Sequence, residues 1–238
     1  MTPGRAQLGV VGRLQRIPLP ALAAASVVLV TGALALVFFV APNDQFLGFS
    51  QRIFYFHVSI AFTAYLSFGF GAWKALLHLW KRDPNADLES YVAIHQGVIF
   101  GVLVLVTGSI WAKYSWGHWW LWSENQLVLF LVLFLFYAAY FMLRFSVDDG
   151  PQRANLCAVY ALFGVVLIPV SFLAIRLAQN FIHPVVFTRH GANFGGWMLV
   201  TYFVTQAAVL LLAYTLYRVE LAGKRLDARL RQLREAYV

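Results

Sequence analysis

The sequence predicts an all-α polytopic membrane protein with six transmembrane helices. Of its 238 residues, 61% are apolar or aromatic and only 12% are charged. Soluble domains carry about 45–50% apolar and about 25% charged residues, so this chain has too little polar surface to cover a water-soluble body. The composition therefore excludes a disordered chain and an ordinary cytosolic enzyme. A single cysteine, Cys157, excludes a disulfide scaffold and reads as a small apolar filler.

Six stretches are long and apolar enough to cross a hydrocarbon core of about 30 Å, which takes roughly 20 residues of helix. They cover residues 19–41, 54–80, 91–112, 126–145, 156–178 and 195–217. Proline, asparagine, aspartate and glycine mark the segments between them as loops. Lipid requires each spanning segment to satisfy its own backbone groups, and the alternation of a membrane barrel is missing from the sequence. We therefore expect one six-helix domain over residues 1–238.

The first stretch has to be weighed against a cleaved signal peptide, because it follows a basic leader with Arg5, Arg13 and Arg16. Its apolar core runs from Pro20 to Ala41, which is longer than the usual signal core of about 7–15 residues. We expect a retained membrane anchor.

The distribution of lysine and arginine predicts the orientation. Of the 18 basic residues, 13 fall in the leader, in the loops around 81–82 and 144–153, and in the C-terminal tail. These 13 lie on one side of the predicted membrane, four lie on the opposite side, and Lys74 lies within a span. The positive-inside rule then places both termini in the cytoplasm. The net charge of +8 reads as a topology signal and an attraction to anionic lipid, with no nucleic acid as partner.

The tail, residues 219–238, is predicted to form a basic amphipathic helix. Val219, Leu226, Leu230 and Leu233 are spaced at helical intervals, with arginine and lysine between them. We expect this helix to lie on the inner membrane face; a docking site for a cytoplasmic partner is the alternative. The sequence has no phosphate-binding glycine loop, so ATP hydrolysis by this chain is not expected.

Histidines gather on the outer side of the predicted topology. His57 lies at the outer end of the second span and His183 just past the outer end of the fifth, while His118 and His190 lie in outer loops. The ordinary explanation for one such residue is an interfacial ring bonded to a carbonyl or a lipid headgroup. Two histidines at matching depth on separate spans favour a shared ligand. Zinc would lack further ligands nearby, whereas haem iron needs only one or two axial nitrogens.

A tryptophan-rich outer loop, residues 111–126, joins the third and fourth spans. Five of the eight tryptophans of the chain lie within twelve residues there. An aromatic belt would distribute them over all helix ends, so their concentration indicates a platform for a flat, conjugated ligand. Trp116, Trp119 and Trp120 would share one face of a short helix, and Gly117 would let a ring approach the backbone.

The run from Trp116 to Trp122 resembles the "WWD" signature of haem-handling proteins of cytochrome c biogenesis. With the six spans, the Phe-Tyr-Phe-His57-Val pattern and His183-Pro184, nearly the whole chain resembles the CcmC family. The resemblance implies a multi-pass protein of the bacterial inner membrane that binds haem b non-covalently, with His57 and His183 as axial ligands of the iron. It implies a periplasmic haem platform made of Trp116, Gly117, Trp119, Trp120 and Trp122.

The resemblance also implies partners. Members of the family deliver haem to the periplasmic haem chaperone CcmE and work with the ABC-type subunits CcmA and CcmB and the small membrane protein CcmD. The chain would then be a carrier rather than an enzyme.

The sequence departs from the family signature after the last tryptophan. Ser123-Glu124-Asn125-Gln126 replaces the family's Asp, small residue and Arg. We expect Ser123 to cap the fourth helix and Glu124 to lie in its first turn. Glu124 and His118 are secondary candidates for the site. Arg52 is a third, because with Asp44 on the first outer loop it would contact haem propionates or a partner.

Two other functions stay open from the sequence. A membrane b-type cytochrome that carries electrons would use an inner histidine pair, for which His78 and His95 are available. A small-molecule permease would need broken helices at the midplane, for which Pro169, Gly69 and Gly71 are candidates. The permease is disfavoured because the spans hold few charges, and Lys74 and Arg176 are placed where they can reach the membrane surface.

Overall fold

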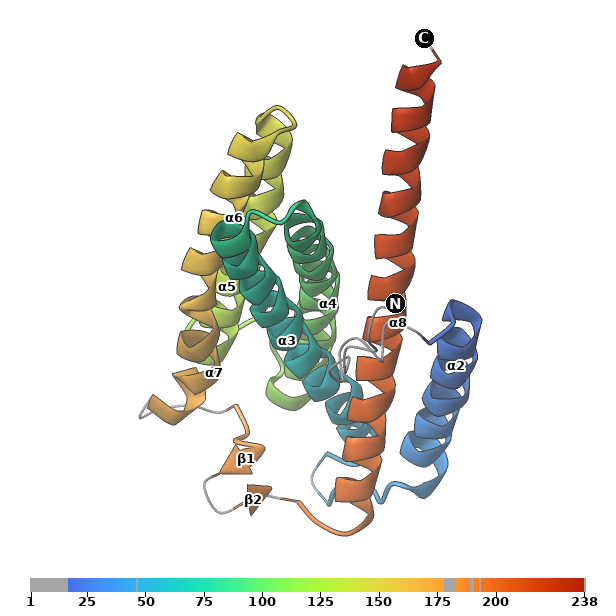
Figure 1. The fold of residues 1–238 in the computed structure, drawn as a ribbon. Coiled ribbons are helices and arrows are strands. Elements are labelled where there is room, and N and C mark those ends of the chain that lie inside the picture. The colour runs from blue at the N-terminus through green and yellow to red at the C-terminus, as the bar shows by residue number, and fades with distance from the viewer. Residues whose placement is uncertain (1–16, 46, 178–182, 189–190, 193, 238) are drawn as a thin grey trace.

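The computed structural model describes residues 17–45, 47–177, 183–188, 191–192 and 194–237. The helices are α2 (Leu19–Ala35), α3 (Arg52–Lys81), α4 (Pro84–Trp116), α5 (Asn125–Ser146), α6 (Pro151–Val165), α7 (Leu167–Leu177) and α8 (Trp197–Ala236) (Figure 1). A π-helical turn, η1 (Leu36–Val40), extends α2, and a 3-10 turn, η2 (Phe49–Gln51), leads into α3. Strands β1 (Phe187–Thr188) and β2 (Gly191–Ala192) pair antiparallel in the segment before α8.

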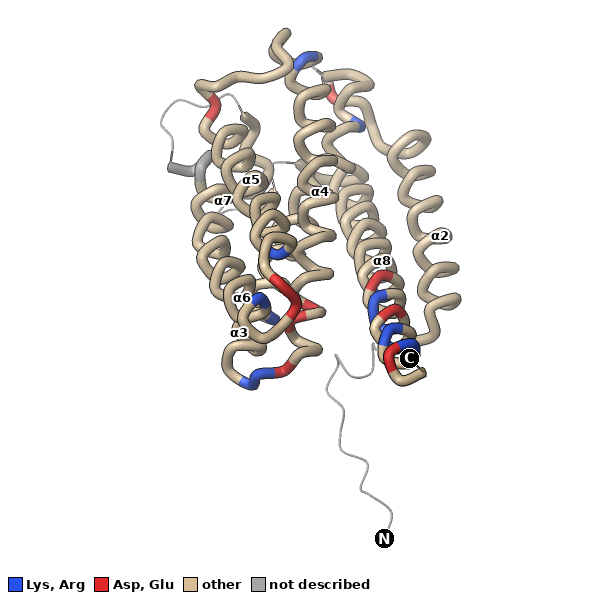
Figure 2. Tube along the Cα trace, turned by 90° about the horizontal axis from the view of Figure 1, so that it is seen from above, with Lys and Arg blue, Asp and Glu red and all other residues tan. Residues whose placement is uncertain are grey.

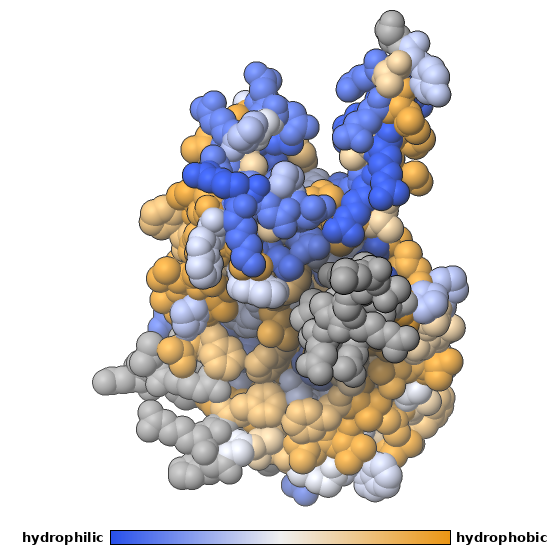
Figure 3. Space-filling model, in the orientation of Figure 1, coloured by the Kyte–Doolittle hydropathy of each residue, from blue (hydrophilic) through white to orange (hydrophobic). Residues whose placement is uncertain are grey.

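The six predicted spans are confirmed. The helical segments long and apolar enough to cross a membrane are Leu19–Val40, Phe49–Lys81, Pro84–Trp116, Asn125–Ser146, Pro151–Leu173 and Trp197–Ala236. Charged residues gather at the helix ends (Figure 2). On the face shown in Figure 3, hydrophilic residues concentrate at the end that carries the C-terminus of α8, and apolar residues cover most of the rest. Which end faces the cytoplasm stays a prediction, and the leader arginines lie outside the described residues.

Local chemistry sets the ends of the long helices. The carboxylate of Asp83 caps α4 by accepting the N–H of Asn85 at 2.9 Å, and Pro84 occupies the first helical position. Arg82, with φ of 55°, closes α3 in the left-handed conformation. Gly117, with φ of 78°, closes α4 in the same way. These two left-handed residues therefore set the lengths of α3 and α4.

The fifth span is broken, as its proline predicts. Its helix stops at Val165 and restarts at Leu167. Pro169 has no N–H to donate to the carbonyl of Val165, and its ring would clash with that carbonyl in a continuous helix. Gly69 and Gly71 produce no corresponding break, because α3 is continuous from Arg52 to Lys81.

Close packing around α3 forms the core. The ring of Phe68 stacks on Tyr137 of α5, with centroids 4.1 Å apart and planes within 5°. A Cβ at Gly71 would lie 2.6 Å from Ile94 Cγ1, and a Cβ at Gly97 would lie 2.6 Å from the Phe68 ring. Small residues therefore let α3 and α4 approach closely, which is how helices associate in lipid.

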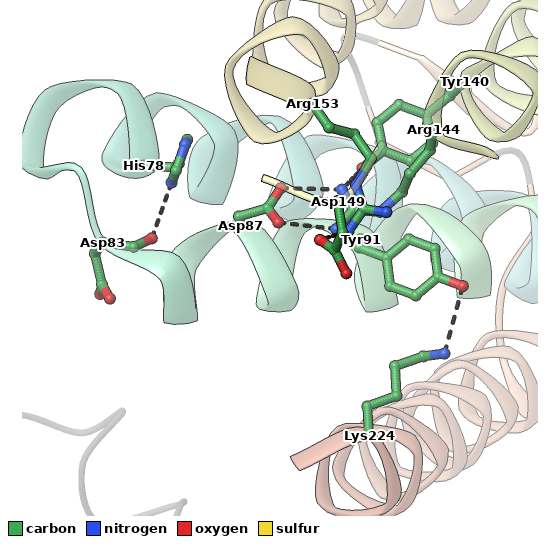
Figure 4. A network of polar contacts seen from close by, with 9 residues as sticks. All are labelled: His78, Asp83, Asp87, Tyr91, Tyr140, Arg144, Asp149, Arg153 and Lys224. Atoms are coloured by element: carbon green, nitrogen blue, oxygen red, sulfur yellow. Dashed lines mark hydrogen bonds and ion pairs between the residues drawn. The ribbon is translucent and has the colours of Figure 1, made fainter. Parts of the chain in front are cut away.

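A buried polar network ties the helices together at the end where α3 turns into α4 (Figure 4). The guanidinium of Arg144 donates two bonds to Asp87, at 3.0 and 2.8 Å, and a third to the Tyr140 hydroxyl at 3.0 Å. Lys74 lies 2.5 Å from Glu89 and is largely buried. The expectation that Lys74 reaches the membrane surface is therefore wrong, because a carboxylate on α4 neutralises it within the bundle. The side chain of Arg176 lies outside the described residues.

Helix α8 packs against α2 and then continues beyond the bundle (Figure 1). The hydroxyls of Ser26 and Thr215 share a buried hydrogen bond of 2.8 Å between these two helices. With 40 residues, α8 is about 60 Å long, twice the thickness of the hydrocarbon core. The predicted tail is helical, but it continues the last span without a break instead of turning along the membrane face.

Candidate functional site

His57 lies near the start of α3, with its ring against α4. Its Nδ1 is 2.9 Å from Thr107 Oγ1, and that hydroxyl donates its only proton to the carbonyl of Leu103 at 2.7 Å. The hydroxyl therefore accepts the bond from His57, so Nδ1 carries the ring proton and Nε2 keeps its lone pair. Gly108 makes room for the ring, since a Cβ there would lie 2.9 Å from His57 Cε1.

His183 lies in the segment between α7 and β1. Its Nδ1 is 3.3 Å from the carbonyl oxygen of Pro184, which can only accept, so Nε2 of this ring also keeps its lone pair. Burial lowers the pKa of the His183 imidazole, against the opposing effects of the Pro184 carbonyl and of Glu124. The ring is therefore neutral at pH 7, the form that binds a metal ion.

Two adjoining cavities meet at these histidines. Both His57 and His183 line both cavities. The first cavity runs between α3, α4 and α5, and its aromatic and histidine lining comprises His57, Phe62, Tyr65, Trp111, Trp116, Trp120, Phe130, Phe172, His183 and Phe187. The second lies toward the first outer loop and α8, and its lining includes Asp44, Gln51, Phe54, Trp111, Phe194 and Met198. The structure thus brings together the two histidines that the sequence placed at matching depth.

The tryptophans separate into two groups. Trp116 and Trp120 line the first cavity, and the Trp116 ring lies 6.1 Å from His183. Trp119 and Trp122 are 60% and 74% exposed. The predicted short helix that would align Trp116, Trp119 and Trp120 is wrong, because α4 ends at Trp116 and residues 117–124 are not helical. Gly117 ends that helix in the left-handed conformation, and the close approach of a ligand ring to its backbone stays a prediction.

Three residues of α4 belong to the site although the sequence analysis did not select them. Thr107 and Gly108 contact His57, and Trp111 lines both cavities with its ring 6.3 Å from His183. These residues lie at i, i+1 and i+4 and share one helix face. Residues three and four positions before Trp111 lie on the same helix face as Trp111, so this spacing in the sequence would have identified Thr107 and Gly108.

Glu124 has a different role from the expected one. It occupies the N-cap position of α5 instead of the first turn, and Ser123 does not cap the helix. Its carboxylate is buried and accepts the backbone N–H of His183 at 3.3 Å. The displaced acidic group therefore links the tryptophan loop to the second histidine, 59 residues away.

The other secondary candidates lie outside the two cavities. Arg52 donates to Asn43 Oδ1 at 2.5 Å and its guanidinium lies 4.3 Å from the centre of the Phe49 ring. His118 is exposed and lines neither cavity. Of the acidic residues, Asp44 reaches the second cavity and accepts the N–H of Leu47 at 2.8 Å. His190 lies outside the described residues.

The donor set fits haem better than a bare metal ion. Within the part of the chain that the structure describes, no three His, Cys, Asp or Glu side chains form a metal-binding group. Two neutral imidazoles with free Nε2 atoms beside aromatic-lined cavities match a cofactor that brings four equatorial ligands of its own.

Comparison with known proteins assigns the chain to a family. A family model described as "Heme exporter protein C" matches residues 6–236. The chain belongs to the CcmC family. A "Heme exporter protein C" of Bradyrhizobium diazoefficiens is 32% identical over 219 residues, covering 90% of this chain and 81% of the relative. That of Escherichia coli K12 is 34% identical over 173 residues, covering 71% and 70%.

A more distant relative extends the likeness beyond bacteria. A ccmC-like mitochondrial protein of cytochrome c biosynthesis from Marchantia polymorpha is 26% identical over 188 residues, 79% of each chain. The predicted family is therefore confirmed, and with it a role in haem handling for cytochrome c maturation. The matched range includes the two histidines, the tryptophan loop and the whole of the long C-terminal helix α8.

The inner histidines have separate protein partners in this CcmC-family chain. His78 Nδ1 bonds the Asp83 carbonyl at 2.9 Å, whereas His95 Nδ1 bonds the Glu220 carboxylate at 2.9 Å and stacks on Tyr91. His78 thus joins the end of α3 to the start of α4, and His95 joins α4 to α8. Of the histidines that the structure describes, His57 and His183 line the two cavities and the inner pair does not, which favours the outer site as the haem site.

Proposed function

We propose that this membrane protein binds haem b non-covalently at its periplasmic face and presents it to a CcmE-type haem chaperone. The observation that carries the proposal is the pair of imidazoles, His57 and His183, which line the same two cavities and whose Nδ1 atoms are engaged in hydrogen bonds, so that Nε2 keeps its lone pair. Bound haem would supply an iron that takes two axial nitrogens and a flat apolar ring. The family membership supports haem handling as the task.

The residues divide the work between holding the iron and covering the ring. Thr107 holds the His57 ring through Nδ1 and leaves Nε2 unprotonated, and Glu124 holds the backbone of His183. Trp111, Trp116 and Trp120 offer apolar surface to the macrocycle. Trp119 and Trp122 stay exposed, and we propose that they contact the acceptor protein.

Release is as necessary to a carrier as binding. His57 belongs to the long helix α3, whereas His183 lies in an irregular segment, where its backbone N–H donates to Glu124 at 3.3 Å. We propose that His183 is the ligand that the acceptor replaces. No covalent bond is formed by this chain, which acts as a carrier and not as an enzyme.

The proposed setting follows the positive-inside rule. Both termini lie in the cytoplasm of a bacterium, the tryptophan loop lies in the periplasm, and CcmA, CcmB and CcmD are the membrane partners. Single cysteines at the exposed positions 122 and 231 test this topology, because the native Cys157 is buried. A membrane-impermeant thiol reagent added to intact spheroplasts should label position 122 and not position 231.

Haem binding is tested with three single variants of the purified protein. His57→Ala and His183→Ala should each alter the haem Soret band and lower haem retention, because each removes one axial nitrogen. His118→Ala is the matched control, an exposed histidine of the same outer face, and should leave the spectrum unchanged. Unchanged spectra in both axial variants would refute the bis-histidine site.

Delivery is tested separately by mixing the haem-loaded protein with a purified CcmE-type acceptor. Haem should appear on the acceptor with the wild-type protein. Retention of all haem by the carrier would contradict delivery while leaving haem binding intact. Rapid reversible oxidation and reduction with a quinone would support the electron-carrier alternative instead.

A further inference from the structure

The end of α8 forms an arm that stands away from the bundle. We call residues 226–237 the C-terminal arm (Figures 1 and 3). Every residue of the arm is exposed. Within the described chain, no side chain of the arm makes a hydrogen bond or ion pair with the bundle. The haem site lies at the opposite end of the helices and makes no use of this surface.

The root of the arm is fixed to α4. Three contacts hold it: Glu220 to His95 Nδ1 at 2.9 Å, Lys224 Nζ to the Tyr91 hydroxyl at 3.4 Å (Figure 4), and Arg225 Nη2 to Glu89 Oε1 at 3.3 Å. Glu89 is in turn paired with Lys74 of α3. The arm is therefore held in one direction, as a continuation of the last span, rather than laid along the membrane.

One face of the arm has the apolar spacing of a coiled coil. Leu226, Leu230, Leu233 and Tyr237 are separated by four, three and four residues, the pattern of alternating core positions. Their exposed fractions are 57%, 45%, 55% and 89%. An apolar stripe of this kind is normally covered by a facing helix.

Arginines flank this stripe on both sides. With Leu230 at a core position, Arg229 and Arg234 take flanking positions that pair across a coiled coil and set the choice of partner. Asp227, beside Leu226, takes a third, so the described flanking charges are net positive. Two copies in one membrane have the same orientation, so their arms would be parallel and Arg229 of one would face Arg234 of the other. Repulsion between them disfavours a second copy and favours carboxylates on the facing helix.

We propose that the C-terminal arm docks an amphipathic helix of another protein, with an apolar stripe flanked by aspartate and glutamate. The charge of the flanking positions selects the acidic partner, and the fixed root presents the stripe at a defined place beyond the bundle. By the predicted topology this place is in the cytoplasm. The arm thereby gives this carrier a contact surface on the cytoplasmic side of the membrane, while haem is handled on the periplasmic side.

The experiment uses the full chain in nanodiscs of zwitterionic lipid and two fluorescent helical peptides. Both peptides carry leucine at the core positions; one has glutamate and the other lysine at the flanking positions. We expect the glutamate peptide to bind about tenfold more tightly at low salt. The R229E/R234E double variant should reverse this preference.

Two further variants separate the stripe from general electrostatics. Arg231→Glu changes an equal charge on the far face of the helix and should leave the preference for the glutamate peptide within twofold. L230A/L233A should abolish binding of both peptides. Equal affinity for the two peptides, no binding, or an Arg231→Glu variant that reverses the preference would overturn the proposal.

The competing occupants give distinct results. A thiol-reactive dye labels the Glu235→Cys variant at position 235 alone, because the native Cys157 is buried. The dye is first measured without peptide, in zwitterionic and in anionic nanodiscs. If anionic lipid shields the dye from an aqueous quencher, the membrane surface is the occupant, and the proposal is overturned. If the wild-type chain forms dimers that dissociate in L230A/L233A, the occupant is a second copy of the chain, and the proposal is overturned. A monomeric chain whose dye stays accessible to the quencher in both kinds of nanodisc supports the proposal.

Discussion

Thr107 Oγ1 accepts the ring N–H of His57 at 2.9 Å while donating to its own helix at Leu103. This one hydroxyl fixes which nitrogen of His57 is free. Thr107→Val removes the acceptor and keeps the volume of the side chain, so haem affinity should fall by roughly 10–100-fold, as is usual when the partner of a metal-binding histidine is lost. Haem titration measures this. Thr107→Ser keeps the hydroxyl and should bind within a few fold of wild type, and equal loss in both variants would contradict the role of the hydroxyl.

Gly108 sets the position of the His57 ring because its missing side chain leaves room for the imidazole. Because a Cβ would lie 2.9 Å from His57 Cε1, Gly108→Ala should displace the imidazole, lower haem affinity at least about tenfold and shift the Soret band. Gly69→Ala is the matched control, a glycine in a spanning helix with open space around it. If both variants bound haem like wild type, the ring would not depend on this contact.

The backbone N–H of His183 donates to the buried carboxylate of Glu124 at 3.3 Å, which joins the tryptophan loop to the second histidine through a charged group. Glu124→Ala removes a buried acceptor and should leave His183 poorly placed, so the haem spectrum should move toward that of His183→Ala. Glu124→Gln keeps a carbonyl oxygen and should bind better than the alanine variant. Ser123→Ala, at an exposed neighbour, serves as control and should have no effect.

The division of the tryptophans predicts two phenotypes. Trp116→Ala and Trp120→Ala remove rings from the first cavity and should reduce haem retention. Trp119→Ala and Trp122→Ala remove exposed rings and should leave haem retention within about twofold while slowing transfer to a CcmE-type acceptor. Haem content after purification and a transfer assay distinguish them. Equal loss of haem in all four variants would show that the loop acts as one platform.

The Arg144–Asp87 pair predicts a stability effect far from the site. Arg144→Met leaves a carboxylate without its partner and should lower the free energy of unfolding by about 3 kcal/mol. A double variant, D87A/R144M, should lose less than the sum of the two single changes. Unfolding in mixed micelles by circular dichroism provides the comparison. Additive losses would mean that the pair contributes no coupling energy.

Local features of the sequence sufficed for much of the fold. Hydropathy over about 20 residues located all six spans, and Pro169 marked the break in the fifth, because both signals act within one helix. The tryptophan loop and the two outer histidines were enough for the family. These residues are distinctive by their types and spacing, which do not depend on how the helices pack.

Contacts between distant positions could not be read in this way. The bond from Glu124 to His183 spans 59 residues, and the pairing of Lys74 with Glu89 depends on the register between α3 and α4. Periodicity also misplaced Trp119, because Gly117 ends the helix on which the spacing was counted. In each case an expectation based on one segment failed where a neighbour or a helix end determined the geometry.

The sequence by itself determined the membrane class, the six spans, the family and the two candidate histidines. Tertiary structure decided which nitrogen of each histidine is free, which tryptophans face the cavities, and that the tail continues the last span. The physical reason is that burial in lipid acts on each segment alone. A hydrogen bond, a cavity wall or the direction of a helix end requires a second segment, placed by packing.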